Sequence, residues 1–324
     1  MQEQARAFWV TAPGCGEIRD EALAPPTERD VVVQTLYSGI SRGTEALVFG
    51  GHVPESEWDR MRAPFQVGDF PSPVKYGYAS VGRVIGGLDT LKDRIVFVLY
   101  PHQTQFVVPA TAVHTVPDGV PPARGVLAAN LETALNGVWD ARPHVGDRIS
   151  VVGAGAVGCL AAWLASRVPG CDVELVDINP SREAVARALG VRFAEPGSAA
   201  NERDVVIHAS GAPAGLDLAL GLAAIEARVV ELSWFGDQAV PLSLGGAFHA
   251  KRLTIQSSQV GRVAPAQRPR WDTRRRMQLA LRLLSDPALD TLITGESAFE
   301  TLPDVMAQLT ESPGDTLCHR VRYA

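Results

Sequence analysis

The sequence predicts an α/β fold that combines a small β domain with a doubly wound parallel sheet. Two features carry this prediction. Up to about Pro117, short runs of β-branched and aromatic residues are bounded by Gly, Pro and Asp, which is typical of a β domain with frequent turns. From Pro121 onward, apolar strand-length runs alternate with helix-length segments, which indicates right-handed βαβ crossovers and a parallel sheet.

The expected elements follow from these patterns in chain order. Strands are expected over 31–36, 80–85, 94–99 and 106–109, and then a helix over 123–141. Strands over 148–153, 173–177, 204–209 and 228–232 alternate with helices over 157–168, 181–189 and 216–225. The chain ends with a helix over 273–284, a strand near 292–294, a helix over 302–309 and a strand over 316–323. A chain of 324 residues corresponds to about two domains, and we assign them to 1–120 with 263–324, and to 121–262.

The composition favours a small-molecule partner over nucleic acid or a membrane. The chain has 30 Lys and Arg and 36 Asp and Glu residues, a net charge of −6, which argues against a polyanionic or anionic-lipid partner. No apolar run approaches the roughly 18 residues of a membrane span. The first six residues include an acid where a signal peptide carries positive charge. Because the four cysteines are far apart, we expect a reducing, cytoplasmic location without disulfides.

A glycine-rich motif predicts a dinucleotide site. Gly153, Gly155 and Gly158 form GxGxxG between an expected strand and an expected helix, which is the context that gives the motif meaning. The first glycine makes the tight turn, the second lets the backbone approach the pyrophosphate, and the third lets the helix pack on the strand. Ala156 and Val157 open that helix, whose N-terminal N–H groups favour an anion.

The residues after the second strand of this domain bear on the choice of cofactor. Asp177 lies about twenty residues past the last glycine, where a carboxylate can accept hydrogen bonds from the adenosine ribose. Such a carboxylate repels a 2′-phosphate, so NAD is favoured over NADP. Asn179 belongs to the same turn. Arg182 could reach a phosphate instead, or it could be a solvated arginine in the first turn of a helix.

The order of these parts resembles the medium-chain dehydrogenase/reductase family, which includes the zinc alcohol dehydrogenases and their zinc-free relatives. The resemblance covers essentially the whole chain. Residues 37–45 (YSGISRGTE) resemble the family's CGICGTD segment, 75–82 (KYGYASVG) resemble PGHExxGxV, and 93–96 (DRIV) resemble GDRV. Residues 130–134 (NLETA) resemble the helix whose Thr faces the nicotinamide, and 204–211 (DVVIHASG) resemble DVVxExxG. The first two segments look most like the bacteriochlorophyllide dehydrogenase-like subgroup.

This resemblance has implications for fold, cofactor and assembly. It implies a GroES-like β domain and a Rossmann domain, with a C-terminal return to the first domain and the cofactor in the cleft between them. It adds Thr133, Ser210 and Gly211 to the cofactor-binding residues. It also implies a homodimer or homotetramer.

The chain departs from the family at the zinc ligands. Ser41, or Arg42 because one residue is inserted, stands where zinc members carry the first cysteine. Tyr78 replaces the histidine, and the third ligand falls near Ala129. Catalytic zinc needs three protein ligands, and the segment 97–106 contains no cysteine for a structural zinc lobe. We therefore expect no zinc. The alternative is a substitute site drawn from four side chains: His52, His102, His114 and Glu132.

Without a metal, a developing alkoxide needs a hydrogen-bond donor and the departing proton needs a relay. The resemblance places Ser41, Thr44 and Tyr78 where the metal and its relay would lie, and His102 and Glu132 in segments that border the substrate pocket. Each also has a structural interpretation. Tyr78 could simply fill the vacant metal pocket, Ser41 and Thr44 could cap turns, and His102 and Glu132 could be ordinary loop and helix-start residues.

The roles of two groups of basic residues have alternative interpretations. Lys75, three residues before Tyr78, could lower the pKa of that phenol by proximity. The run 268–276 (RPRWDTRRR) could bind an anionic substrate, or it could be the solvated start of a helix.

The resemblance and the residues together predict an enzyme: a zinc-independent, NAD-dependent oxidoreductase that interconverts a secondary alcohol and a ketone on a small organic molecule. One alternative is a quinone or enoyl reductase, because zinc-free family members often reduce activated double bonds. Another is a dinucleotide-binding protein without catalysis. Hydride exchange with a substrate separates the enzymes from a pure binder.

Overall fold

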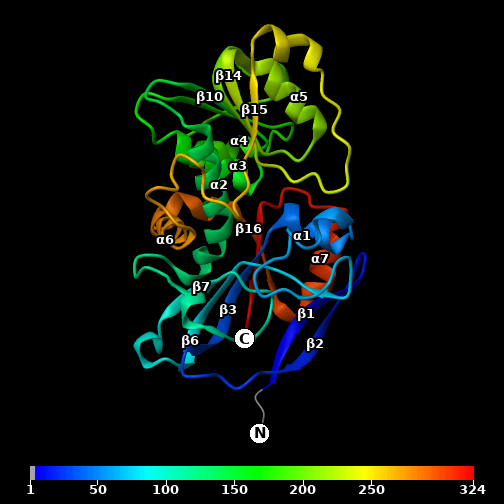
Figure 1. Cartoon of the computed structure of the whole chain (residues 1–324), viewed down its shortest axis with the longest axis vertical. Helices are drawn as coiled ribbons and strands as arrows, with labels where there is room; N and C mark the ends of the chain where they lie inside the picture. The colour runs from blue at the N-terminus through cyan, green and yellow to red at the C-terminus, as the bar shows by residue number, and fades with distance from the viewer. Residues whose placement is uncertain (1–3) are drawn as a thin grey trace. The chain divides into compact units, whose positions relative to one another are not determined.

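The computed structural model describes residues 4–324, and Glu3, the acid in the N-terminal segment compared with a signal peptide, lies outside the described residues. The chain divides into two compact units, one formed by residues up to Ala129 with Met277–Ala324, the other by Asn130–Arg276 (Figure 1). Both boundaries fall later in the chain than 120 and 262. They lie inside two helices, α2 (Ala128–Ala141) and α6 (Thr273–Leu283).

The first unit is built on two sheets. One has four strands in the order β2-β1-β5-β4, and the other has seven, in the order β16-β17-β3-β6-β7-β9 with β8 paired to β3. The strands are β1 (Gln4–Ala12), β2 (Cys15–Ala22), β3 (Asp30–Ile40), β4 (Val67–Gly68), β5 (Val74–Lys75), β6 (Ser80–Gly87), β7 (Ile95–Val98), β8 (Gln105–Pro109), β9 (His114–Thr115), β16 (Ile293–Ala298) and β17 (Cys318–Arg322). Helices α1 (Arg42–Phe49) and α7 (Leu302–Glu311) complete it.

The four strands expected in the first part of the chain correspond to β3, β6, β7 and β8. The hairpin of β1 and β2 is absent from the expected elements. Strand β1 does bury Ala7, Phe8 and Val10, but β2 (CGEIRDEA) has no fully buried side chain and lacks the apolar alternation that marks a strand in sequence. Its pairing with β1 holds it in the sheet.

Strand β3 is the central strand that positions the site of this unit. It pairs antiparallel with β6, β8 and β17, and Figure 1 shows it beside β6. Val31 and Val33 of β3 are fully buried and pack in a cluster with Val84 of β6 and Phe106 of β8. The strand is therefore fixed along its length, and its last residues lead directly into α1.

The second unit is a doubly wound parallel sheet, as predicted. Its strand order is β12-β11-β10-β13-β14-β15, and every neighbouring pair is parallel. The strands are β10 (Arg148–Val152), β11 (Asp172–Val176), β12 (Arg192–Ala194), β13 (Arg203–His208), β14 (Ala223–Glu231) and β15 (Thr254–Ser257). Its helices include α3 (Ala156–Ala165), α4 (Arg182–Ala188) and α5 (Pro213–Leu222). In sequence rank this is the order 3-2-1-4-5-6, which creates a switch point between β10 and β13.

The helix predicted over 216–225 is wrong at both ends. Helix α5 begins at Pro213, whose fixed φ suits the first helical turn. It ends at Leu222, and Ala223 already pairs with Arg203 of β13. The pairing then skips to Val205 and Arg228, so a bulge takes up residues between them. The alanine-rich run was compatible with a helix in sequence, and strand pairing overrides that preference here.

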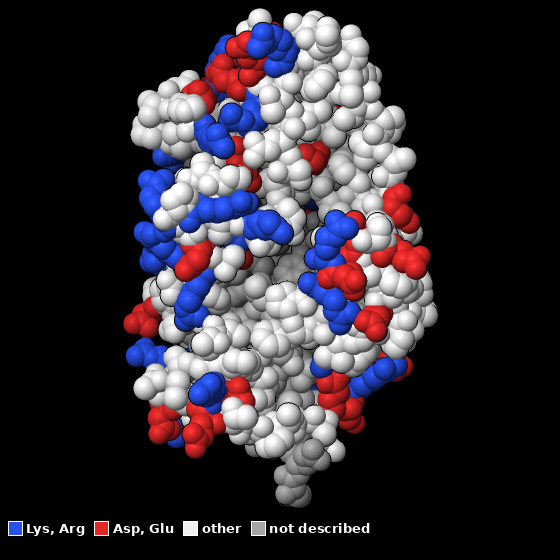
Figure 2. Space-filling view, viewed as in Figure 1, with Lys and Arg blue, Asp and Glu red and all other residues white. Residues whose placement is uncertain are grey.

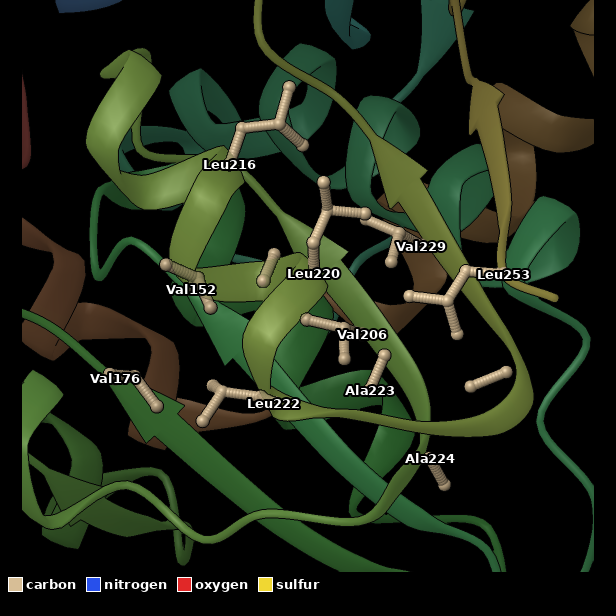
Figure 3. Packing of buried hydrophobic residues seen from close by; sticks show 12 residues of the cluster. Val152, Val176, Val206, Leu216, Leu220, Leu222, Ala223, Ala224, Val229 and Leu253 are labelled. Atoms are coloured by element: carbon tan, nitrogen blue, oxygen red, sulfur yellow. The ribbon is translucent and has the colours of Figure 1, made fainter. Parts of the chain in front are cut away.

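The core of the second unit lies between α5 and the sheet. Leu216 and Leu220 of α5 belong to the same buried cluster as Val206 of β13 and Val229 of β14. Figure 3 shows Leu220 among the side chains of the strands. This packing fixes the ends of β13 and β14 relative to α5. Within residues 4–324, no helix is long and apolar enough to cross a membrane.

Candidate functional site

The glycine motif lies where the sequence placed it, between β10 and α3. Gly153 has φ +104°, a left-handed conformation that favours glycine. A Cβ at Gly158 would lie 1.8 Å from the carbonyl oxygen of Gly153, so only glycine fits where the helix meets the strand. At Gly155 a Cβ would meet nothing within 4 Å, so the loop is open there to a ligand. With Ala156 and Val157 in the partly exposed first turn of α3, the residues fit a dinucleotide pyrophosphate.

Asp177 follows β11 and already bonds to the glycine loop. Its Oδ2 accepts the N–H of Ala154 at 2.6 Å, and its Oδ1 accepts the N–H of Asn179 at 2.9 Å. The carboxylate is partly exposed and keeps lone pairs for further donors. It is therefore fixed beside the pyrophosphate loop in a position suited to ribose hydroxyls.

Arg182 is not the solvated arginine that its place in a helix suggested. It is 5% exposed, and its charge lowers the pKa of the Cys159 thiol, although burial dominates and raises that pKa to about 12. Asn179 forms the turn before α4, where its side-chain oxygen accepts the N–H of Ser181. Burial removes Arg182 from bulk solvent and keeps its charge inside the nucleotide-binding unit.

The remaining expected cofactor contacts lie on other elements of the second unit. Thr133 is a partly exposed residue of α2. Ser210 and Gly211 are exposed in the loop after β13. A Cβ at Gly153 would lie 2.5 Å from Cα of Ser210, so this loop touches the first glycine of the motif.

Three hydroxyl groups meet in the first unit at the end of β3 and the start of α1. The phenol of Tyr78 is hydrogen-bonded to the hydroxyls of Ser41 and Thr44. Ser41 is the N-cap of α1, but its side chain makes no capping hydrogen bond, so the turn-cap interpretation does not describe its hydroxyl. The three residues that the sequence singled out as donors therefore form one cluster.

The surroundings of Tyr78 keep its phenol protonated. Burial raises the pKa of Tyr78 well above its ordinary range, and the Glu45 carboxylate adds to the rise, whereas the bonds to Ser41 and Thr44 oppose it. The suggestion that Lys75 lowers this pKa is wrong. The ammonium of Lys75 is buried and bonds to Glu21 Oε2 at 2.6 Å and Gln103 Oε1 at 2.8 Å.

His102 lies in a buried chain of hydrogen bonds, so the interpretation as an ordinary loop residue does not hold. Its Nε2 is 2.8 Å from Glu45 Oε2, and its Nδ1 is 2.7 Å from the hydroxyl of Ser38. Ser38 is in turn 2.9 Å from the phenol oxygen of Tyr323. The other oxygen of Glu45 accepts the N–H of Ser41. The His102–Glu45 pair thus holds the segment that carries Ser41 and Thr44.

Glu132 belongs to a different network, in the second unit. Its Oε1 lies 3.0 Å from Nε of Arg276, and both side chains are buried. Burial raises the pKa of Glu132, and the Arg276 guanidinium opposes that rise. Arg276 also donates to Asn136 Oδ1 and to the carbonyl of Val260. The carboxylate is therefore held by an arginine, and a catalytic role for it stays a prediction.

The same contact corrects the view of residues 268–276 as a uniformly solvated basic run. Arg274 and Arg275 are exposed, whereas Arg276 is 1% exposed. On the face shown in Figure 2, basic side chains gather at the level of α6 in Figure 1. Of the three consecutive arginines at the start of α6, the first two thus point outward and Arg276 forms the buried pair with Glu132.

The donor set at the place of the family's zinc ligands does not fit zinc. Ser41 and Tyr78 offer hydroxyl oxygens, where zinc prefers thiolate, imidazole or carboxylate. Among residues 4–324, no group of three or more His, Cys, Asp or Glu side chains could hold a metal ion. The four side chains that the sequence suggested as a substitute site, His52, His102, His114 and Glu132, do not form such a group.

Sequence reasoning missed Glu45, Ser38 and Tyr323 in the first unit. Glu45 and Ser38 lie inside the segment 37–45 that carries the resemblance, so their position was a usable signal. Tyr323 is far along the chain, and only the pairing of β17 with β3 brings it to Ser38.

No family model matches the chain. Two curated proteins are similar to it over most of their length. D-guloside 3-dehydrogenase of Escherichia coli is 24% identical over 327 residues, covering 92% of this chain and 90% of the relative. An uncharacterized zinc-type alcohol dehydrogenase-like protein of Haemophilus influenzae is 25% identical over 355 residues, covering 98% of each.

Two solved structures share the fold over nearly the whole chain. A protein from Sinorhizobium meliloti 1021, named as a zinc-binding dehydrogenase and solved with NADP, has a TM-score of 0.79 at 17% identity, covering 99% of this chain and 100% of the other. An alcohol dehydrogenase from E. coli CFT073 solved with NADH has a TM-score of 0.78 at 16% identity, covering 98% and 99%.

Proposed function

We propose that the chain is a zinc-independent, NAD-dependent dehydrogenase of the medium-chain dehydrogenase/reductase superfamily, on the basis of its similarity to a zinc-type alcohol dehydrogenase-like protein and its shared fold with solved dehydrogenases. Its reaction interconverts a secondary alcohol and a ketone on a small organic molecule. The curated relatives named for a substrate, such as D-guloside 3-dehydrogenase, support an alcohol-type substrate. The observation that carries the zinc-independent part is the hydroxyl cluster of Tyr78, Ser41 and Thr44 at the place of the metal ligands.

The nicotinamide supplies or accepts hydride when bound. What this chain must supply is a proton and an orienting contact at the substrate oxygen. A neutral phenol at Tyr78 can donate a hydrogen bond to a carbonyl oxygen, which is where negative charge develops during reduction. The bonds to Ser41 and Thr44 orient the phenol, and the raised pKa of Tyr78 keeps it a neutral donor. It would pass its proton to the substrate oxygen as hydride arrives there and regain a proton from solvent. These properties suit the reductive direction.

Asp177 supports NAD as the cofactor. A carboxylate at the end of β11 would repel the 2′-phosphate of NADP and can accept hydrogen bonds from ribose hydroxyls. The structural relatives are divided, since one is solved with NADP and another with NADH. Arg182 is the nearby residue whose positive charge would favour NADP over NAD, if it could reach the 2′-phosphate. Its side chain is buried and does not extend into solvent, which favours NAD.

The whole chain, mixed with NAD and a panel of secondary alcohols and polyols, tests this proposal through the absorbance of NADH. A deuterium-labelled alcohol gives the decisive readout, because a dehydrogenase transfers the label to one face of the nicotinamide. Binding of NADH with no transfer to or from any alcohol, ketone, quinone or enone would overturn the catalytic assignment. Transfer confined to quinones or enones would replace the alcohol substrate.

A further inference from the structure

A buried imidazole and a carboxylate end two adjacent strands of the second unit. His208 is fully buried at the end of β13, and Glu231 lies opposite it in register at the end of β14. His208 Nδ1 is 2.6 Å from Glu231 Oε2, and its Nε2 is 2.6 Å from the hydroxyl of Ser210. Glu231 Oε1 also accepts the N–H of Ser233 at 2.6 Å. The pair therefore ties together the loops that follow both strands.

This pair ends the strands on the nicotinamide side of the dinucleotide site. In doubly wound sheets each half binds one mononucleotide at the carboxyl ends of its strands. The half β10–β12 carries Asp177 and suits the adenosine part, so the half β13–β15 is left for the nicotinamide part. Ser210, which is bonded to His208, lies against Gly153 across the switch point between the halves.

The charge of this network depends on one proton. Strand β10 places Val152 beside His208, and Phe235 stacks on the imidazole with centroids 6.2 Å apart. Glu231 is the carboxylate bonded to the ring, and its side chain is 12% exposed. The other charged groups on the neighbouring α5 and on the loop after β14 are Asp217 and Asp237, and both are exposed to solvent. With a neutral imidazole the pair carries one negative charge, and with a protonated one it carries none.

We propose that His208 and Glu231 select the redox state of the bound cofactor through this proton. The nicotinamide ring is cationic in NAD⁺ and neutral in NADH. The negative pair favours NAD⁺, and protonation of His208 removes that preference and shifts binding toward NADH. The inference rests on the nicotinamide cofactor of the proposed function. By linkage, exchange of NAD⁺ for NADH promotes proton uptake at the pair.

Binding titrations of the whole chain with NAD⁺ and with NADH at a series of pH values test the proposal. We expect the ratio of the Kd for NAD⁺ to the Kd for NADH to rise by about tenfold as the pH falls, which is the order of the Coulomb energy of one charge in a partly screened site. In His208→Gln the charge of Glu231 persists, so the ratio should stay at its high-pH value throughout.

Glu231→Gln provides a second variant in case His208→Gln does not fold. It removes the negative charge, so the ratio should exceed that of the parent at high pH. Glu226→Gln is the matched control, since Glu226 is an exposed carboxylate on the same strand, and it should leave the ratio unchanged. If this ratio of Kd values does not change with pH in the parent, or changes equally in His208→Gln, the proposed selection of redox state is overturned and the proposed function still stands. Binding of neither dinucleotide at any pH overturns both.

Discussion

Glu45 and His102 form a buried pair, with Glu45 Oε2 2.8 Å from His102 Nε2 and side chains 3% and 1% exposed. Glu45 also accepts the N–H of Ser41 at the start of α1. The pair therefore joins the loop after β7 to the helix that carries Ser41 and Thr44. Because Glu45 also acts on the pKa of Tyr78, one carboxylate both positions the hydroxyl cluster and favours its protonated state.

Removal of the Glu45 carboxylate should destabilise the protein strongly. In Glu45→Ala, His102 Nε2 and the N–H of Ser41 lose their acceptor in a buried site, a change that costs about 3–5 kcal/mol. Glu45→Gln should cost less, because its amide oxygen can still accept one of these bonds. Urea denaturation measures the free energy of unfolding. The control is Glu300→Ala, which breaks the exposed pair with Arg6 and should cost less than about 1 kcal/mol. Equal losses in the two alanine variants would contradict a structural role for the buried pair.

Tyr78→Phe should lower kcat by about 10²–10³, the usual effect of removing one donor to a developing oxyanion. Cofactor affinity should be unchanged, because the proposed cofactor-binding residues belong to the other unit. Steady-state kinetics with the substrate found in the alcohol panel, and fluorescence titration with NADH, give the two quantities. Tyr100→Phe is the control, a buried tyrosine stacked on Phe106. Near-normal turnover in Tyr78→Phe would make this tyrosine a filler of the pocket, and the candidates would then be Ser41, Thr44, His102 and Glu132.

The sequence predicted the second unit in more detail than the first. Alternation of strands and helices, GxGxxG and Asp177 are local signals, and right-handed crossovers imply a parallel sheet. The order of its strands comes from the structure. In the first unit, Lys75 bonds to Glu21 and Gln103 rather than approaching Tyr78, and that choice is set by pairing of β1 with β5 and β2. Long-range pairing of this kind is invisible in a single sequence, as is the burial of Arg276 against Glu132.

NADH should bind at least about tenfold tighter than NADPH, a difference of about 1.4 kcal/mol. The reason is the carboxylate of Asp177, which accepts ribose hydroxyls and repels a 2′-phosphate. Asp177→Ala should weaken NADH binding and narrow the gap, and it also removes the acceptor of the Ala154 N–H. Titration of both dinucleotides measures the effect. Glu183→Ala, an exposed carboxylate on α4, serves as control. Equal affinities of the parent for NADH and NADPH would refute the assignment.

The purified protein should contain well under one zinc per chain, because the residues at the ligand positions are poor zinc donors. Elemental analysis measures the metal, and turnover after prolonged chelation shows whether it matters. Activity should survive chelation. Stoichiometric zinc that is lost together with activity would reverse the zinc-independent part of the proposal.

Stability should fall in two steps at alkaline pH. Burial raises the pKa of the Cys159 and Cys318 thiols to about 12, and it also raises the pKa of the Tyr78 and Tyr323 phenols. A group whose pKa is higher in the folded state contributes stability that is fully present below its unfolded pKa and is lost as the pH rises toward the folded value. With unfolded values of about 8.5 for Cys and about 10 for Tyr, Tm should be level below about pH 8.5, then decline, and decline more steeply above about pH 10. Thermal unfolding across this range measures the profile of Tm against pH.

Two variants separate the contributions of the thiols and the phenols. Cys318→Ser should make the decline of Tm above about pH 8.5 smaller, because its hydroxyl does not titrate there. Tyr323→Phe should make the decline above about pH 10 smaller. A Tm that is constant through pH 11, or one that falls equally in both variants and the parent, would show that these buried groups do not set the alkaline limit.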